Sequence, residues 1–161
     1  MKTNAMRILD AHKIKYEVFE YTKDQSLTGS DIAGILKEDP NRCFKTLITK
    51  SKTNEYYAFL VPVNQELDLK KAATSIHEKS LEMIPFKDLL KVTGYIHGGC
   101  SPIGMKKDYK VTIDNTCLNF SEIYLSGGQV GVQIKLKLSD LSSLINPNFA
   151  DITRKNPANL D

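Results

Sequence analysis

Two neighbouring runs of β-branched and aromatic residues most constrain the fold of this 161-residue chain. The runs read CFKTLITKS (43–51) and YYAFLVPVN (56–64), and the polar segment KTNE (52–55) separates them. Two such runs on either side of a short polar turn predict a β-hairpin. Alternation along the first run leaves apolar residues on both of its sides, which is typical of a strand buried on two faces.

Helices and further strands are predicted around this hairpin. Apolar spacing and end signals predict helices over 3–13, 28–37, 66–77, 85–94 and 138–146. The expected N-cap residues are Thr3 or Asn4, Ser30, Asp68 and Ser139, and Gly94 is expected to end the fourth helix. Strands are predicted over 16–21, 110–115, 122–128 and 129–136. Because hairpins outnumber β-α-β units, we expect an α+β fold with a mixed, partly closed, barrel-like sheet flanked by helices.

Length and composition indicate one domain, 1–155, followed by a polar tail, 156–161. The sequence has no apolar run of membrane-spanning length and no secretory signal, so a cytoplasmic protein without a membrane partner is expected. A net charge of +3 is too small for coating nucleic acid by charge alone, but it allows one small basic site. Three cysteines without paired spacing argue against a disulfide framework.

Lys45 is the first candidate for a functional residue, because it interrupts an otherwise apolar strand. A lysine in such a strand must either extend its ammonium group to an edge of the sheet or meet an anion. Spacing alone favours the first interpretation. Lysine is nevertheless well suited to hold a phosphate as a point charge.

Two glycine-rich segments are further candidates. HGGCSPIGMKK (97–107) contains three glycines and a proline but lacks the spacing of a P-loop, which argues against nucleotide hydrolysis. Its exposed N–H groups could form an anion nest or an oxyanion hole, or the segment could be a plain turn. YLSGGQVG (124–131) is by itself a hairpin turn with a bulge. Lys106, Lys107 and Lys110, beside the first segment, are solvated lysines by default and could steer a polyanion.

Other reactive side chains show weaker patterns. His97 and Cys100 are three residues apart, but no further ligands at suitable spacing complete a zinc site, so no metal is expected. His12 and His77 are expected on the surface. Cys100 would be a nucleophile only with a base and an orienting group nearby, and a buried packing role is the alternative.

Four segments, taken in order, resemble the YbaK family. They are FKTLI (44–48), PVNQELDLKK (62–71), TGYIHGGCSPIG (93–104) and IYLSGGQVG (123–131). The family comprises free-standing deacylases that clear Cys-tRNA(Pro), and it shares its fold with the editing domain inserted in bacterial prolyl-tRNA synthetases. The resemblance extends from about Thr3 to Arg154 and implies the same fold, with tRNA(Pro) carrying cysteine as substrate, prolyl-tRNA synthetase as partner, and no cofactor.

The resemblance also implies roles for individual residues. Lys45 would hold the phosphate or ribose of the terminal adenosine and is implied to be catalytic, together with the backbone of Gly98 and Gly99 facing the ester. The implied substrate-binding residues are Tyr21, Thr46, Ser101, Pro102, Ser126, Gly127 and Gly128. The thiol of the bound cysteine would attack its own ester carbonyl, which gives the hydrolysis a lyase-like first step and requires no protein nucleophile. Orientation of the carbonyl and stabilisation of its oxyanion would then be the main tasks of the protein.

Two departures from the family pattern and three alternatives remain open. Cys100 stands where an apolar residue is expected, and Gln133 stands where relatives can have an acidic residue, so no catalytic role is assigned to Gln133. The alternatives are a deacylase for Ala-tRNA(Pro), a non-catalytic module that binds tRNA or the synthetase, and a hydrolase that uses Cys100 as nucleophile.

Overall fold

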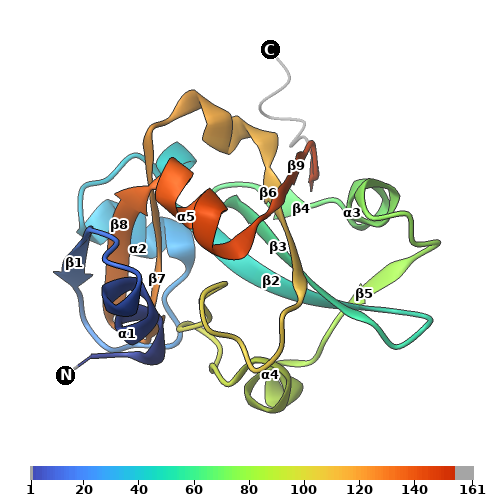
Figure 1. Cartoon of the computed structure of the whole chain (residues 1–161), viewed down its shortest axis with the longest axis horizontal. Coiled ribbons are helices and arrows are strands. Elements are labelled where there is room, and N and C mark those ends of the chain that lie inside the picture. Colours follow the sequence, from blue (N-terminus) through green and yellow to red (C-terminus); the bar gives the residue numbers. More distant parts are fainter. Residues whose placement is uncertain (1, 155–161) are drawn as a thin grey trace.

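A computed structural model describes residues 2–154, in which five short α-helices surround strands arranged in three sheets (Figure 1). The largest sheet has the strand order β5-β2-β3-β6-β9. Its strands are β2 (Phe44–Ser51), β3 (Tyr56–Pro62), β5 (Leu81–Met83), β6 (Lys110–Asp114) and β9 (Asn148–Ala150). β2 and β3 form the predicted antiparallel hairpin, whereas β6 pairs in parallel with both of its neighbours. The sheet is therefore mixed, as expected.

A second, antiparallel sheet has the order β1-β8-β7. Its strands are β1 (Tyr16–Glu20), β7 (Glu122–Gln129) and β8 (Val132–Lys137), and a small third sheet pairs β4 (Glu66–Leu67) with β10 (Thr153–Arg154). An isolated bridge between Cys43 and Tyr124 joins the first two sheets at the start of β2. No sheet within residues 2–154 closes on itself, so the prediction of barrel-like closure is not confirmed.

The helices lie close to the predicted ranges. They are α1 (Asn4–Ala11), α2 (Gly29–Ile35), α3 (Leu69–Ser75), α4 (Phe86–Thr93) and α5 (Leu138–Ile145), and two 3₁₀ helices are η1 (Pro40–Arg42) and η2 (Asn115–Asn119). The predicted caps Thr3 and Asp68 accept hydrogen bonds from the first-turn N–H groups of α1 and α3. Gly94 ends α4 in the left-handed conformation that glycine tolerates.

Two predicted caps are wrong. α2 begins two residues earlier than a cap at Ser30 would require, because Thr28 and Asp31 form a reciprocal capping box at its N-terminus. α5 follows β8 directly, so Lys137 occupies the N-cap position and no side chain caps the helix. The sequence predicts a Ser139 cap, but burial of Leu138 and Leu141 stabilises the start of this helix instead.

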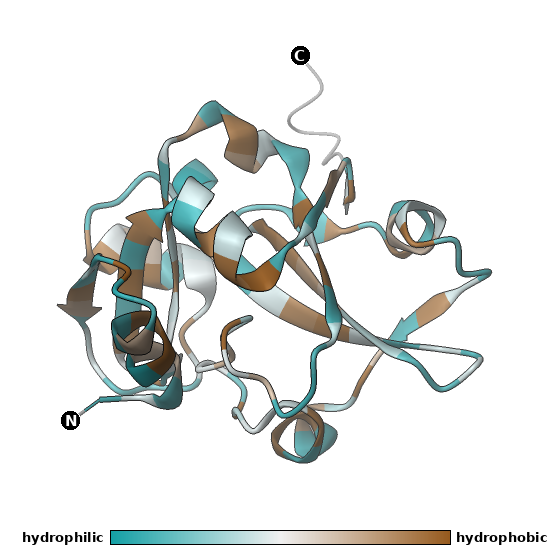
Figure 2. Cartoon of the chain, in the orientation of Figure 1, coloured by the Kyte–Doolittle hydropathy of each residue, from teal (hydrophilic) through white to brown (hydrophobic). Residues whose placement is uncertain are grey.

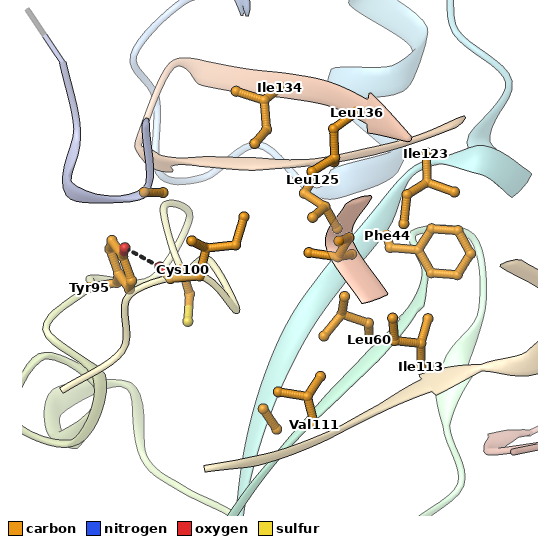
Figure 3. Packing of buried hydrophobic residues seen from close by; sticks show 14 of the residues in the cluster. Phe44, Leu60, Tyr95, Cys100, Val111, Ile113, Ile123, Leu125, Ile134 and Leu136 are labelled. Atoms are coloured by element: carbon orange, nitrogen blue, oxygen red, sulfur yellow. Dashed lines mark hydrogen bonds between the residues drawn. The ribbon is translucent and has the colours of Figure 1, made fainter. Parts of the chain in front are cut away.

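Two hydrophobic clusters cover the opposite faces of β3. Leu60 belongs to a large cluster between the two main sheets, whereas Phe59 and Val61 belong to a smaller cluster beneath α3. Figure 3 shows the large cluster, with Tyr95 and Cys100 at its edge beside residues of β7 and β8. Figure 2 shows the corresponding hydrophobic stretches on β2 and β3 and the hydrophilic tip of their hairpin. Two-sided burial was predicted for β2, where Phe44 and Ile48 belong to the large cluster and Leu47 packs, partly buried, against the small one.

No helix within residues 2–154 has both the length and the apolar character needed to cross a bilayer. The polar tail predicted for 156–161 lies outside the described residues, as does residue 155 at the predicted end of the domain.

Candidate functional site

A cavity of about 560 Å³ opens between the start of α2, strand β2, the loop after α4, and strands β7 and β8. Its volume suits a small organic group that is largely enclosed. Most of its wall is apolar, with Ile48, Ile84, Leu89 and Leu125 among the lining side chains. Lys45 is the only Lys, Arg, Asp or Glu among the described residues that line it.

Lys45 lies on β2, opposite Val61 in the neighbouring strand. Its side chain is half-buried, and no carboxylate within residues 2–154 lies close enough to form an ion pair with it. Burial lowers the pKa of Lys45 below its ordinary value, and the more distant carboxylate of Glu66 opposes this effect. The hairpin thus holds an unpaired cation against the cavity, a position in which an anionic ligand would be bound favourably.

Thr46 and Tyr21 line the same cavity. The Thr46 hydroxyl is buried and has no hydrogen-bond partner among the described residues. Tyr21 follows β1, and burial raises the pKa of its phenol, an effect that the N–H of Gly131 partly offsets. Since a buried hydroxyl without a partner is costly, Thr46 is suited to bind a polar group of a ligand.

The two glycines predicted to face the ester lie in different surroundings. Gly98 lines the cavity, adopts a φ of 88°, and its N–H has no acceptor among the described residues. Gly99 is buried outside the cavity lining, and its N–H donates to the carbonyl of Ile96 at 3.0 Å. Of the two amides, only that of Gly98 is available to a ligand in the cavity.

Ser101 and Pro102 are buried behind the cavity wall and do not line it. The Ser101 hydroxyl accepts a hydrogen bond from the N–H of Ile103 at 3.1 Å. Nearby, the Tyr95 hydroxyl donates to the Ile103 carbonyl, and this bond is drawn dashed in Figure 3. These contacts brace the turn that carries Gly98.

The second glycine segment, 124–131, contributes Leu125 and Ser126 to the cavity lining. Ser126 on β7 lines the cavity, while its hydroxyl accepts a hydrogen bond from the N–H of Gly128 at 3.1 Å. Gly127 and Gly128 do not line it. The Gly127 carbonyl accepts a hydrogen bond from the Thr3 hydroxyl at 2.6 Å, which ties this segment to the start of α1.

Cys100 lines the cavity but lacks the surroundings of a reactive thiol. Its side chain is 8% exposed, and burial raises its pKa to about 12, an effect that the Thr93 hydroxyl only partly offsets. Cys43, a second lining thiol, also has its pKa raised to about 12, by burial and by the neighbouring Glu38 carboxylate. Because the thiolate is the nucleophile, pKa values this high leave both thiols protonated at neutral pH and speak against a nucleophilic role.

Gln133 was assigned no role from sequence, yet it faces the cavity. It is 7% exposed, and its side-chain oxygen Oε1 is buried without a partner among the described residues. Residues 25–29 also line one rim, and no motif in the sequence marks them. Pairing of β8 with β7 brings Gln133 opposite Ser126, and this register could not be read from the sequence.

No three His, Cys, Asp or Glu side chains within residues 2–154 come together in a way that could hold a metal ion. His97 stacks on Phe86, and Lys106, Lys107 and Lys110 are exposed and do not line the cavity.

Comparison with known proteins gives consistent results. Residues 24–144 match the model of the aminoacyl-tRNA editing domain family. Over 155 residues, covering 96% of this chain and 94% of the relative, the sequence is 42% identical to an Enterococcus faecalis protein with the provisional name Cys-tRNA(Pro)/Cys-tRNA(Cys) deacylase EbsC.

Two further similarities concern prolyl-tRNA synthetases. The chain is 29% identical over 145 residues to the proline–tRNA ligase of Fervidobacterium nodosum. This alignment covers 86% of the chain but only 25% of that enzyme. A crystal structure described as a candidate trans-editing enzyme for prolyl-tRNA synthetase superposes with a TM-score of 0.80 at 21% identity, covering 96% of this chain and all of the other. The latter similarity concerns the fold alone.

Proposed function

Because the chain belongs to the aminoacyl-tRNA editing domain family, we propose that it acts in trans as a deacylase that hydrolyses Cys-tRNA(Pro). The Enterococcus faecalis relative, which is similar over nearly its whole length, carries a name with this activity and supports the proposal. Since that name also includes Cys-tRNA(Cys), both tRNAs belong in a test of the substrate range.

The observation that carries the proposal is the unpaired, half-buried Lys45 beside an otherwise uncharged cavity. A tRNA end brings a phosphate and a ribose next to an aminoacyl ester, so one cation at the edge of an apolar pocket suits it. The ammonium group of Lys45 would bind the terminal phosphate or ribose, and the Thr46 hydroxyl and the Tyr21 phenol would contact the ester end.

The Gly98 amide is the proposed donor to the developing oxyanion. Its N–H borders the cavity and has no acceptor within residues 2–154. A donor fixed in place before the reaction stabilises the negative charge of the transition state without reorganisation. The φ of 88° at Gly98 is one that a residue with a side chain rarely adopts. Gly99, Ser101, Pro102, Gly127 and Gly128 would act indirectly, by supporting this turn and the Ser126 side of the pocket.

We propose that the nucleophile is the thiol of the bound cysteine. Its sulfur would form a bond to its own carbonyl carbon while the bond from that carbon to the ribose oxygen breaks, and the thiol proton would pass to the leaving oxygen. Water would then open the resulting thiolactone to cysteine. The raised pKa values of Cys100 and Cys43 support a mechanism without a protein thiolate. Cysteine would be selected over proline because proline lacks the thiol.

Prolyl-tRNA synthetase is the proposed partner. A net charge of +3 gives little non-specific attraction to a polyanion, so selection of tRNA(Pro) would depend on the synthetase that has just released it.

The test compares deacylation of Cys-tRNA(Pro) and Ser-tRNA(Pro), two substrates that differ chiefly by sulfur and oxygen. Fast loss of cysteine with much slower loss of serine is the expected result. Equal rates would contradict attack by the substrate thiol. If Cys-tRNA(Pro) stays intact while Ala-tRNA(Pro) is cleaved, the proposed substrate is wrong. If neither is cleaved, a non-catalytic binding module becomes the favoured function.

A further inference from the structure

Phe86 and His97 form a stacked pair of rings at the mouth of the cavity. Their ring centroids lie 3.8 Å apart and their planes are inclined by 17°. Both side chains line the cavity and both are exposed to solvent, Phe86 by 67%. The pair therefore presents an aromatic face at the entrance, outside the hydrophobic core.

The backbone on either side of the pair is held in place. Phe86 is the first residue of α4, whose Leu89 and Val92 are buried in the large cluster. The carbonyl of His97 accepts a hydrogen bond from the side-chain amide of Gln25 at 3.0 Å. Because both ring-bearing segments are anchored and the rings stack on each other, less conformational freedom is lost when a ligand binds to them.

The surroundings of the pair suit a flat, uncharged group. Met83 also lines this side of the cavity and is exposed, and Lys45 is the only formally charged residue among the described lining residues. An aromatic face in such surroundings offers stacking and dispersion to a flat group. Nucleic-acid bases bind to aromatic side chains in this way, since every base has a π-face.

The position of the Phe86–His97 pair relative to the proposed reaction centre indicates which nucleic-acid base it would bind. Every aminoacyl ester of tRNA is carried on the ribose of the 3′-terminal adenosine, so the adenine lies one sugar away from the reacting carbonyl. Gly98, the proposed oxyanion donor, directly follows His97 in the chain. A ribose with its ester at Gly98 and its phosphate near Lys45 would direct its base towards the mouth of the cavity.

We propose that Phe86 and His97 form the stacking site for the terminal adenine of the aminoacyl-tRNA, an inference that rests on the proposed function for the identity of the substrate. Stacking would hold the base in the ground state and in the transition state alike. Its loss therefore raises KM and leaves kcat unchanged.

The kinetic test compares Phe86→Ala with Leu90→Ala. Leu90 lies on the same helix and is 53% exposed, but it does not line the cavity. Phe86→Ala is expected to raise KM for Cys-tRNA(Pro) by ~10-fold. It leaves hydrolysis of cysteine ethyl ester, which has no nucleoside, unchanged. Leu90→Ala behaves as wild type, and Phe86→Tyr, which keeps a stacking ring, restores KM. An unchanged KM in Phe86→Ala, or equal losses with both esters, overturns the proposal.

A binding test separates this proposal from the proposed function. AMP and ribose 5-phosphate are titrated into the full chain while NMR follows the ring signals of His97, in wild type and in Phe86→Ala. AMP is expected to shift these signals more than ribose 5-phosphate does, and Phe86→Ala to weaken the AMP response. Equal responses to both ligands, or no response, overturn the stacking site. A protein that binds AMP at these rings but leaves Cys-tRNA(Pro) intact refutes the deacylase function and keeps the stacking site.

Discussion

Gly99 and Val130 lie so close together that a Cβ atom on the glycine would come within 2.9 Å of the Val130 backbone nitrogen. The neighbouring carbonyl carbon of Gln129 would be equally close. The glycine segment after α4 therefore packs, backbone against backbone, on the turn between β7 and β8. This contact joins two segments about 30 residues apart into one wall behind the cavity.

Replacement of Gly99 by alanine is expected to destabilise the protein. Backbone atoms cannot move aside as a flexible side chain can, so Gly99→Ala should lower the free energy of unfolding by about 1–3 kcal/mol. Gly34→Ala is the matched control, because a Cβ on this exposed glycine of α2 meets no atom within 4 Å. There alanine should stabilise the helix by roughly 0.5–1 kcal/mol. Urea denaturation of both variants measures the difference, and equal effects would contradict the close packing.

Replacement of Lys45 should weaken deacylation without unfolding the protein. Lys45→Met is expected to reduce kcat/KM for Cys-tRNA(Pro) by roughly 10- to 100-fold, because the loss of one charge-assisted hydrogen bond changes the binding free energy by an amount that corresponds to this factor. Lys50→Met, on the same strand but outside the cavity lining, is the control and should retain activity. Steady-state deacylation kinetics check this prediction, and loss of activity in both variants would indicate general damage to β2.

The same Lys45 variant makes a prediction about pH. Because the folded pKa is lowered, the protonated ammonium disfavours the native state at pH values below its ordinary pKa of 10.5. Wild type should therefore gain stability relative to Lys45→Met as the pH rises towards 10.5. At neutral pH, its free energy of unfolding should be the lower of the two. Denaturation midpoints of the pair between neutral and alkaline pH give the sign, and a difference that is independent of pH would refute the burial effect.

Cys100 should be dispensable for catalysis. Its thiol, with a pKa raised to about 12, is protonated at neutral pH, so Cys100→Ala should keep its deacylation activity while losing some packing stability. Rapid chemical quench with Cys-tRNA(Pro), combined with a melting curve, separates the two effects. A Cys100→Ala variant that folds but is inactive would contradict this prediction and favour a protein nucleophile over the substrate thiol.

Helix caps provide a contrast between two hydroxyl residues. Thr28→Ala removes the capping box of α2 and should cost about 1 kcal/mol of stability. Ser139→Ala should be nearly neutral, because Ser139 lies inside α5 and its side chain does not cap the helix. Thermal unfolding of the two variants checks the order. Since Thr28 also lines the cavity rim, a weaker affinity for Cys-tRNA(Pro) is expected in Thr28→Ala alone.

Features that depend on neighbouring residues in the chain were determined by the sequence. The hairpin of β2 and β3 follows from two β-forming runs and one polar turn, and the Asp68 cap and the Gly94 stop follow from local hydrogen bonding and from the conformational freedom of glycine. The candidate lysine was also found locally, because a charge in a strand buried on both faces is conspicuous at any position.

Only the tertiary structure decided which of the candidate residues share a surface. Gly98 and Gly99 are adjacent in sequence, yet one borders the cavity and the other packs on the backbone of Val130. Gln133 and the Phe86–His97 pair reach the cavity through strand register and helix packing, which depend on contacts between distant parts of the chain. Composition and periodicity indicate which residues prefer to be buried. Which other residues each of them contacts is determined by packing over the whole domain.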